Sequence, residues 1–381
     1  MKKNNIVVLG GGLVGKPIAF DLANDPDCFV TLVDVNPMDS DMTIPENMQV
    51  VKADARQKSQ LSALLQKADY VVNALPGSIG FGSLRMAIEA GKDIVDIAFY
   101  PENPMDLHDL AVKRGARVIC DMGVAPGMSH LLAGHFAHKL DHVELIEILV
   151  GGLPKIRTRP WEYKAVFSPA DVLEEYTRPA RLIENGMLVT KPALTEVELV
   201  DFNAVGTLEA FNSDGLRSLI YTVKADFMRE KTLRYPGYVA KVKLLADAGF
   251  FNPEKIKVQG VEVSPLALSS QLLFEQWRLD KGEADLTVMR VVVQGLKNGV
   301  RQKFVSDLYD EFDAVSQVHS MARTTGYAAT TALRYLMHNS NIEPGILLPE
   351  KFALVSGVFD FMLSGLKDHG IAYSNKEFST C

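Results

Sequence analysis

The residues IVVLGGGLVG, from Ile6 to Gly15, decide the fold of the first part of this 381-residue chain. A short apolar run ends in glycines at positions 10, 12 and 15, and a helix-like segment follows. Glycines with this spacing allow a tight turn and let the backbone approach a pyrophosphate, which meets the positive end of the following helix. The spacing alone is a weak signal, but its position between a strand and a helix is the context that a dinucleotide site requires.

An acidic residue, Asp34, follows this turn by about twenty residues, at the end of the next apolar run. A carboxylate in this place accepts hydrogen bonds from the adenosine ribose hydroxyls. It would repel a 2′-phosphate, and the three residues that follow it add no positive charge. We therefore expect NAD as the cofactor, with NADP less favoured. The alternative is that Asp34 only ends its strand.

Short apolar runs alternate with helix-like segments as far as residue 122. The runs are Asn5–Leu9, Phe29–Asp34, Met48–Ala53, Tyr70–Ala74, Asp93–Ile97 and Arg117–Asp121. The helix-like segments are 13–24, 57–67, 79–90 and 104–114. This alternation predicts a doubly wound α/β domain of Rossmann type, in which helices cover both faces of a parallel sheet.

Longer strand-like segments follow the glycine- and proline-rich turn after residue 122. They are Glu144–Gly151, Leu199–Val205, Leu219–Asp226 and Leu286–Leu296. Asn298-Gly299 is a strong hairpin signal and would pair the last of them with Val300–Leu308. We expect an α+β domain with a mixed or antiparallel sheet over residues 123–330. Helices near 320–340 and 349–367 would then close the chain.

The composition excludes several classes of protein. A formal charge of −7 argues against a broad nucleic-acid or anionic-membrane surface. No stretch approaches the roughly 20 apolar residues that span a bilayer, and the apolar N-terminus lacks a leader's cleavage site. Cys28, Cys120 and Cys381 lie far apart without metal-ligand spacing, so we expect a cytoplasmic protein with no metal site.

Candidate cofactor contacts stand where the predicted strands end, because ligands bind outside the carboxyl ends of parallel strands. Asp54 could contact the adenine, and the segment after the fourth strand could pass the nicotinamide half. Each could equally be an ordinary turn. The complete predicted cofactor set is Gly10, Gly12, Leu13, Val14, Gly15, Asp34, Asp54, Asn73, Ala74, Leu75 and Pro76.

Two further acids end predicted strands. Asp96 lies four residues before Tyr100, and Asp121 ends the sixth run. Either acid could hold a substrate amine or the nicotinamide amide, and either could instead cap a helix.

The second domain carries polar clusters that a plain core would not need. Its arginines could clamp a carboxylate, although a surface or capping ion pair explains any single one as well. The candidates for contact with a small-molecule substrate are Tyr100, Phe167, Ser168, Tyr176, Asp214, Arg217, Arg234, Arg323 and Thr324.

Seven motifs, in their order along the chain, carry a resemblance. They are GGGLVG, NALPG (Asn73–Gly77), GVAPGMSH (Gly123–His130), VGGLP (Val150–Pro154), DGLR (Asp214–Arg217), TLRYPG (Thr232–Gly237) and SMARTTGY (Ser320–Tyr327). The chain resembles the saccharopine dehydrogenase family over nearly its whole length, and most closely its L-lysine 6-dehydrogenase branch. The first motif is generic, whereas TLRYPG and SMARTTGY are specific.

The resemblance implies an active site in an interdomain cleft and C-terminal helices, over 331–381, that return to the Rossmann domain. The implied reaction is NAD-dependent oxidative deamination of L-lysine at its ε-carbon, which gives ammonia and a semialdehyde that cyclises to a piperideine carboxylate. Hydride transfer needs a neutral amine, and free lysine amine has a pKa of about 10.4, so a base must take its proton. The candidate bases are Asp96, Asp121, His130 and Glu175.

The substrate carboxylate would suit Arg217, Arg234 or Arg323, and its α-ammonium would suit Asp214 or Glu175. Two alternatives stay open. The first is a saccharopine or carboxynorspermidine-type reductase, which joins an amine to a carbonyl compound, and the second is a non-catalytic NAD-binding sensor. By analogy with relatives of this architecture, we expect a homodimer.

Overall fold

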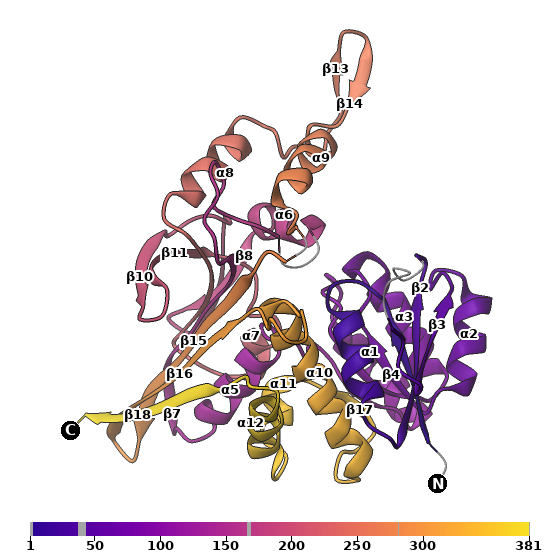
Figure 1. Ribbon diagram of the computed structural model, residues 1–381. Coiled ribbons are helices and arrows are strands. Elements are labelled where there is room, and N and C mark those ends of the chain that lie inside the picture. Colours follow the sequence, from indigo (N-terminus) through magenta and orange to yellow (C-terminus); the bar gives the residue numbers. More distant parts are fainter. Residues whose placement is uncertain (1–2, 37–42, 166–168, 281, 381) are drawn as a thin grey trace. The chain divides into compact units, whose positions relative to one another are not determined.

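The computed structural model describes residues 3–36, 43–165, 169–280 and 282–380, which form two compact units (Figure 1). The first unit comprises Met1–His135 and Ala322–Ile371, and the second comprises Phe136–Met321 and Ala372–Cys381. The first unit therefore continues past the predicted boundary at residue 122. It also takes in a C-terminal segment that begins before the predicted boundary at residue 331.

The first unit is built on a seven-stranded sheet in the order β17-β6-β5-β4-β1-β2-β3. Every neighbouring pair is parallel. The strands are β1 (Asn4–Leu9), β2 (Cys28–Asp34), β3 (Met48–Lys52), β4 (Tyr70–Asn73), β5 (Asp93–Asp96), β6 (Arg117–Ile119) and β17 (Gly345–Leu347). The order 3-2-1-4-5-6 is that of the Rossmann fold, so the predicted fold class of this part is confirmed.

The helices of the first unit begin close to their predicted positions. They are α1 (Gly15–Ala23), α2 (Lys58–Lys67), α3 (Gly77–Glu89), η1 (Pro104–Leu107), α4 (His108–Arg114), α5 (Met128–Ala137), α10 (Ser320–His338), α11 (Pro349–Phe352) and α12 (Val358–Asp368). The single helix expected over 349–367 is wrong. Gly357, with φ +82°, has a left-handed backbone that a helix cannot contain, and it divides α11 from α12.

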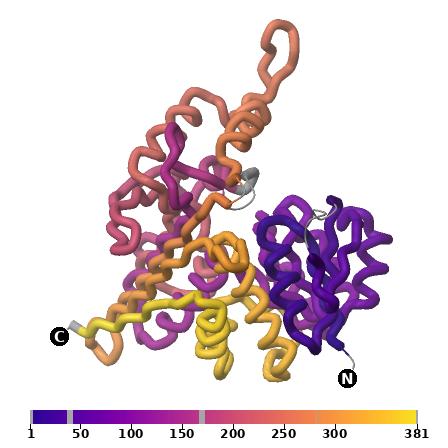
Figure 2. Tube along the Cα trace, viewed as in Figure 1, coloured from indigo at the N-terminus to yellow at the C-terminus, as the bar shows by residue number. Residues whose placement is uncertain are grey.

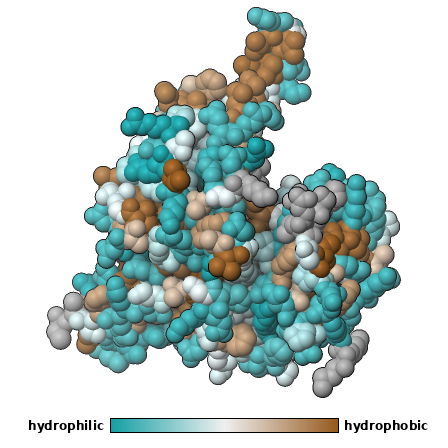
Figure 3. Space-filling view, in the orientation of Figure 1, coloured by the Kyte–Doolittle hydropathy of each residue, from teal (hydrophilic) through white to brown (hydrophobic). Residues whose placement is uncertain are grey.

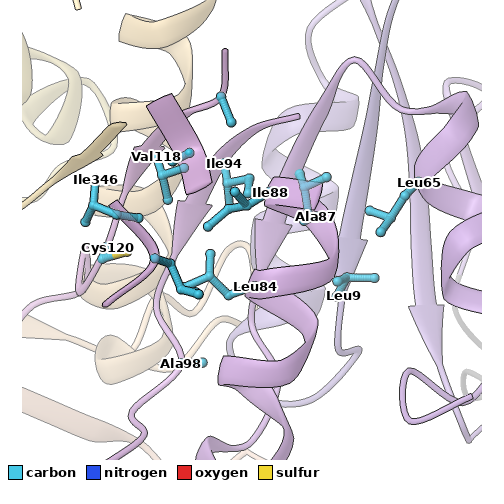
Figure 4. Packing of buried hydrophobic residues seen from close by; sticks show 14 of the residues in the cluster. Leu9, Leu65, Leu84, Ala87, Ile88, Ile94, Ala98, Val118, Cys120 and Ile346 are labelled. Atoms are coloured by element: carbon cyan, nitrogen blue, oxygen red, sulfur yellow. The ribbon is translucent and has the colours of Figure 1, made fainter. Parts of the chain in front are cut away.

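One apolar core fills the space between the sheet and its helices. Figure 4 shows Leu84 and Ile88 of α3 beside Ile94 and Val118 of the strands. All four side chains are fully buried. The Cys28 and Cys120 thiols are buried as well, and burial raises the pKa of Cys28 to about 12. The strands are apolar on both faces because helices cover both sides of the sheet.

The second unit contains a nine-stranded mixed sheet. Its main path runs β10-β11-β12-β7-β15-β16-β18, with β8 paired to β12 and β9 paired to β8. The strands are β7 (His142–Pro154), β8 (Ala180–Glu184), β9 (Met187–Lys191), β10 (Glu198–Phe202), β11 (Gly206–Asn212), β12 (Phe227–Arg234), β15 (Asp285–Lys297), β16 (Val300–Glu311) and β18 (Tyr373–Thr380). Strands β12 and β7 are parallel and the other pairs are antiparallel, which confirms the predicted mixed sheet.

The hairpin predicted at Asn298-Gly299 is present between β15 and β16. Both turn residues have positive φ, as the two-residue hairpin requires. The C-terminal strand β18 then runs along β16, as the yellow end of the tube shows (Figure 2).

The strand predicted over Leu219–Asp226 is wrong. Residues Leu219–Thr222 form the short helix α7, and the strand begins later, at Phe227. The apolar residues of 219–221 imitated a strand. The true strand, β12, buries Glu230, Thr232 and Arg234 along one face, so its sequence lacks the apolar alternation of a half-buried strand.

The other helices of the second unit are α6 (Pro169–Thr177), α8 (Tyr238–Asp247) and α9 (Pro265–Trp277). A separate ribbon of two short strands, β13 (Ile256–Val258) and β14 (Val261–Val263), stands between α8 and α9 in the sequence. Within the described ranges, no helix is both long enough and apolar enough to cross a membrane.

Asp21 of α1 joins the N-terminal and C-terminal parts of the first unit. Its Oδ2 accepts a hydrogen bond from the Arg334 guanidinium at 2.7 Å, and its Oδ1 lies 2.8 Å from Nε2 of His369. The Nδ1 of His369 faces the Gly365 carbonyl at 2.8 Å. Because both ring nitrogens face acceptors, the imidazole fits this place best when it carries two protons and a charge.

These contacts predict how stability depends on pH. Despite burial, hydrogen bonds from His369 and Arg334 hold the pKa of Asp21 at about 2, and the Asp21 contact raises that of His369. The Asp21 contribution, roughly 2 kcal/mol, is present above the ordinary carboxyl pKa of 3.8 and is lost as the pH falls through about 2. The His369 contribution is present below 6.5 and is lost as the pH rises through its raised pKa.

We therefore expect Asp21→Asn to lower the free energy of unfolding most between about pH 4 and pH 6.5. Urea unfolding of both proteins at a series of pH values measures the difference. An equal difference at pH 2 and pH 5.5 would show that the Asp21 charge contributes nothing.

Candidate functional site

The glycine turn of the first unit is built on contacts that no side chain would allow. A Cβ on Gly15 would lie 1.9 Å from the Gly10 carbonyl oxygen, and a Cβ on Gly10, whose φ is +97°, would lie 2.5 Å from the Ala74 oxygen. Around Gly12, in contrast, no described atom lies within 4 Å of the place of a Cβ. Gly10 and Gly15 therefore shape the turn, and Gly12 leaves open space for a ligand.

Helix α1 begins at this turn. Among the residues that the structure describes, the partial positive charge of its N-terminus is not balanced by a capping side chain or by an acid in its first turn. Among the described residues, Val14 at the N-cap makes no side-chain capping hydrogen bond, and the first turn contains no acid. Leu13 beside it is half exposed. Such an end fits the pyrophosphate of a dinucleotide, which the free N–H groups and the helix dipole would stabilise.

Asp34 is fixed at the end of β2 by the turn itself. Its Oδ2 accepts a hydrogen bond from the Gly11 N–H at 2.6 Å, and its Oδ1 accepts one from the Asn36 N–H at 2.8 Å. A carboxylate can accept about four hydrogen bonds, so two remain for ribose hydroxyls. The residues of this turn therefore fit a nicotinamide dinucleotide.

Asp54 holds an arginine that we did not predict. The Arg56 guanidinium contacts both oxygens of Asp54, at 2.8 Å for the shortest, and these hydrogen bonds lower the pKa of Asp54. Because β2 and β3 are parallel neighbours, the Ala53 N–H bonds to the Asp34 carbonyl at 3.0 Å. The segment with Arg56 thus begins beside Asp34, although 22 residues separate the two in sequence.

The segment after β4 supports the turn from the other side. Ala74 contributes the carbonyl that excludes a side chain at Gly10, Leu75 is partly buried, and Pro76 precedes α3. The fully buried Asn73 donates from Nδ2 to the Gly80 carbonyl at 3.0 Å, while its Oδ1 has no hydrogen-bond partner among the described residues.

Asp96 and Tyr100 bond to one another. The fully buried Asp96 accepts hydrogen bonds from the Tyr100 hydroxyl at 2.7 Å and from the Ala98 N–H at 3.0 Å. Burial, together with the Asp96 charge, raises the pKa of Tyr100 far above its ordinary value. These contacts hold the two side chains together in the loop after β5.

The other candidates of the first unit are also buried. Nδ1 of His130 lies 3.0 Å from the Ser129 hydroxyl, and Asp121 has a left-handed backbone with φ +54°. Arg323 donates to the His369 carbonyl, and Thr324 is inaccessible to solvent.

The remaining candidates belong to the second unit, except that Phe167 and Ser168 lie outside the described residues. Three segments that are distant in sequence meet around Arg234, which ends β12 and is 2% exposed. Its guanidinium bonds to Glu175 of α6 at 2.9 Å and to the Tyr176 hydroxyl at 3.3 Å. It also lies 4.4 Å from the centre of the Tyr163 ring.

This Arg234 cluster holds one cation and one carboxylate among phenol groups. The Tyr176 and Tyr238 hydroxyls are 2.9 Å apart, and burial raises the pKa of both phenols, so they stay neutral. Nε of Arg234 is buried and has no hydrogen-bond partner within the described part of the chain. The cluster therefore offers a donor for an anionic ligand group and, in Glu175, an acceptor for a cationic one.

Asp214 is occupied by a partner of its own. Arg181 of β8 contacts its two oxygens at 2.9 Å and 3.0 Å, so this acid holds a loop in place and is not open for a ligand ammonium. Arg217, in the same loop, is 7% exposed and has φ +44°.

Sequence reasoning missed Glu230, a buried acid on β12. Its Oε2 accepts hydrogen bonds from the Ser213 hydroxyl at 2.7 Å and from the Gly215 N–H at 3.0 Å. Burial raises its pKa to about 8, helped by the charges of Glu175 and Asp214. The alternation of Glu230, Thr232 and Arg234 is the signal that could have placed all three on one face of a strand.

Family profiles match almost the whole chain. Residues 6–119 match the saccharopine dehydrogenase NADP binding domain, and residues 123–371 match the saccharopine dehydrogenase C-terminal domain. The chain belongs to the saccharopine dehydrogenase family. The predicted resemblance is thus confirmed at the level of the family, and the lysine 6-dehydrogenase branch stays a prediction.

Relatives within the family are distant. The mouse mitochondrial alpha-aminoadipic semialdehyde synthase is 26% identical over 279 residues, which are 69% of this chain and 30% of that protein. The Saccharomyces cerevisiae saccharopine dehydrogenase (NADP⁺, L-glutamate-forming) is 25% identical over 263 residues, which are 66% of this chain and 59% of that protein. The chain therefore spans about a third to three fifths of the length of these relatives.

A solved structure of this family shares the fold. The apo saccharopine dehydrogenase (L-Glu forming) from Saccharomyces cerevisiae aligns with a TM-score of 0.80 and 20% identity. The alignment covers 98% of this chain and all of that one. The Rossmann unit and the mixed-sheet unit together thus form the family's fold.

The state of Glu230 predicts an effect on stability. With its pKa raised to about 8, folding favours the protonated acid, so stability falls as the pH rises from the ordinary 4.5 through about 8. We expect Glu230→Gln to remove this dependence on pH. Within that window, the free energy of unfolding of the variant should rise relative to that of the native protein by about 1 kcal/mol per pH unit. Thermal unfolding from pH 5 to pH 9 measures the gain.

Glu377→Gln, which changes an exposed acid of β18, is the matched control and should parallel the native protein. A Glu230→Gln curve that also runs parallel to that of the native protein would mean that Glu230 is ionised throughout.

Proposed function

We propose that this protein is an NAD-dependent dehydrogenase that oxidatively deaminates L-lysine at its ε-amine. The observation that carries the proposal is the Arg234 cluster. A buried guanidinium with an unused Nε and a neighbouring Glu175 offers, within one short distance, partners for both charged groups of an amino-acid head. Membership of the saccharopine dehydrogenase family supports an amine of the lysine series as the substrate.

Oxidative deamination removes first a hydride and then the nitrogen from the ε-carbon. The ε-carbon loses a hydride while the lone pair of the neutral amine forms a C=N bond, and water then replaces the nitrogen as ammonia. A bound nicotinamide supplies the hydride acceptor. The tasks left to the protein are to hold the amino-acid head, to fix the ε-carbon and to take one proton from the amine.

Charge balance favours lysine over saccharopine. Both Arg234 and Arg181 already have a carboxylate partner, Glu175 and Asp214 respectively. A substrate with one carboxylate and two amines can bind beside such neutral pairs. Saccharopine has three carboxylates, and each would need an additional cation or a displaced acid.

Five residues are now candidates for the base. Asp96 and Asp121 are buried in the first unit, and so is His130. Glu175 is one-quarter exposed beside Arg234, and it is a candidate base only for a substrate whose α-ammonium it does not hold. Glu230 joins them because a pKa of about 8 suits proton exchange near neutral pH.

The second candidate function is a saccharopine dehydrogenase of the kind named among the relatives. Sequence similarity over about two thirds of the chain supports it. In the direction that this name gives, the oxidised cofactor takes a hydride from a secondary amine, and water then releases L-glutamate, so the enzyme would turn over with saccharopine and not with lysine alone.

The function is tested by mixing the protein with NAD and L-lysine alone. We expect NADH absorbance at 340 nm, and we expect Arg234→Lys to raise the KM for lysine about tenfold or more, because an ammonium cannot keep the Glu175 contact and also offer the Nε donor of the guanidinium. The KM for NAD should stay unchanged, since Arg234 belongs to the second unit.

Arg290→Lys is the control, because Arg290 pairs with Asp307 in the same unit, outside the cluster. Formation of reduced cofactor only when saccharopine replaces lysine would favour the second candidate. NAD binding without turnover of any amino acid would point to a sensor.

The preference for NAD rests on Asp34, whose carboxylate would face a 2′-phosphate. Arg56 is the counter-argument, because it is exposed and its segment begins beside Asp34. We propose NAD because the Arg56 charge is already neutralised by Asp54.

We expect Asp34→Arg to shift the ratio of kcat/KM values from NAD towards NADP by about tenfold or more, because the change removes a ribose acceptor and adds a phosphate partner. Steady-state kinetics with both cofactors measure the ratio. Lys52→Arg, which adds no charge at the neighbouring strand end, is the control. An unchanged ratio in Asp34→Arg would contradict the assignment of Asp34.

A further inference from the structure

The ion pair of Asp54 and Arg56 lies in the turn, residues 53–57, that leads from β3 into α2. Nε of Arg56 donates to both oxygens of Asp54, at 2.9 Å and 3.1 Å, and Nη2 donates to Oδ2 at 2.8 Å. The Arg56 N–H also donates to Oδ1, at 2.9 Å. This is the fork with which a guanidinium binds a planar carboxylate, closed here by a backbone hydrogen bond. The one acid of the turn therefore holds its one arginine.

The fork leaves part of the Arg56 guanidinium unused. Of its five N–H donors, Asp54 engages one on Nε and one on Nη2, which leaves three. Within the described ranges, the Arg56 side chain bonds to no residue other than Asp54. The side chain of Arg56 is 67% exposed, and that of Asp54 is 21% exposed. The three remaining donors are thus open to water or to a ligand.

The turn begins at the strand ends where the binding of NAD and that of NADP differ. Asp34 lies opposite Lys52 in the register of β2 and β3, and the Ala53 N–H bonds to the Asp34 carbonyl at 3.0 Å. In Rossmann domains the acid after the second strand binds the ribose 2′-hydroxyl of NAD, and an arginine nearby accommodates the 2′-phosphate of NADP. Arg56 follows Ala53 by three residues, so it is the arginine that could serve such a phosphate.

The charges of this segment are those of a phosphate site to which one acid has been added. Residues 52–58 contain three exposed cations, Lys52, Arg56 and Lys58, and a single acid, Asp54. Figure 3 shows mostly hydrophilic side chains over α2, the helix that begins at Lys58. The Arg56 hydrogen bonds lower the pKa of Asp54, so this acid is ionised at neutral pH. One carboxylate thus neutralises the arginine in the middle of a basic segment.

We propose that Asp54 is a second determinant of cofactor selectivity, which disfavours NADP by holding the Arg56 guanidinium. This role rests on the proposed NAD site and adds to that of Asp34, whose carboxylate would repel a 2′-phosphate. A 2′-phosphate can recruit Arg56 only by taking it from Asp54 or by lying beside the Asp54 charge, and both weaken its binding. Because an exposed ion pair is weak, Asp54 shifts the cofactor preference and does not make it absolute.

Bracing of the turn does not explain the carboxylate of Asp54. The backbone of this residue is held separately, because its N–H donates to Oε1 of Gln60 at 3.0 Å and its carbonyl accepts from the Gln57 N–H at 2.9 Å. An asparagine at this position would keep both bonds, and its amide oxygen could still accept from the Arg56 N–H. We therefore expect Asp54→Asn to fold like the native protein, with the Arg56 guanidinium released.

The test is isothermal titration calorimetry of the full chain with 2′,5′-ADP and with 5′-AMP, two cofactor fragments that differ only in the 2′-phosphate. The ratio of the two dissociation constants cancels any contact of Asp54 with the adenine. We expect Asp54→Asn to shift this ratio towards 2′,5′-ADP by about fivefold, the size of an exposed ion pair. Added salt should reduce the shift, because exposed charges are screened.

The double variant Asp54→Asn, Arg56→Gln should lose the shift, since the gain comes through the guanidinium. Glu89→Gln, which breaks the exposed ion pair with Arg85 on α3, is the matched control and should leave the ratio unchanged. The melting temperature shows whether each variant keeps its fold.

An unchanged ratio in Asp54→Asn would overturn the proposal, and so would a shift that survives in the double variant. Failure of both fragments to bind the native protein would overturn it as well. Lysine plays no part in these titrations. A protein that shows the shift but does not oxidise lysine would therefore contradict the proposed reaction and leave the role of Asp54 supported.

Discussion

The close contact between Gly15 and the carbonyl oxygen of Gly10 is the constraint on which the first unit depends. At 1.9 Å, the place of a Cβ on Gly15 is already filled, so the chain can pass from β1 into α1 only with glycine there. The same turn receives Asp34 from β2 through the Gly11 N–H, and it rests against Ala74 after β4. One steric condition thus gathers the ends of three strands and the start of a helix.

Much of this architecture could be predicted from the sequence because each buried parallel strand consists of consecutive apolar residues. β12 could not, since it buries Glu230, Thr232 and Arg234 and satisfies them with hydrogen bonds and ion pairs. β17 was missed for another reason. It has only three residues, and more than 200 residues separate it in sequence from β6, the strand with which it pairs. No local sequence pattern therefore predicts it.

The candidate site, like the fold, could be predicted from the sequence only in part. Motifs identified the residues of the glycine turn and Arg234. Glu175 and Tyr176 were candidates for the base and for substrate contact, and the fold brings both to Arg234. Sequence could not show that Asp214 already has a partner in Arg181, because that pairing joins strand β8 to a loop 33 residues later in the chain. Glu230 was missed because its chemistry comes from burial, which is a property of the fold and not of the residue type.

The order of the units along the chain has a consequence for biosynthesis. The first unit is complete only when β17 and α12 have been synthesised. By then, every strand of the second unit except β18 has been synthesised as well. A ribosome-bound chain that ends near residue 340 would therefore hold an open parallel sheet, with the edge of β6 uncovered. Stop codons or proteolytic cuts in the last tenth of the chain would damage both units at once, although the glycine turn lies at the opposite end.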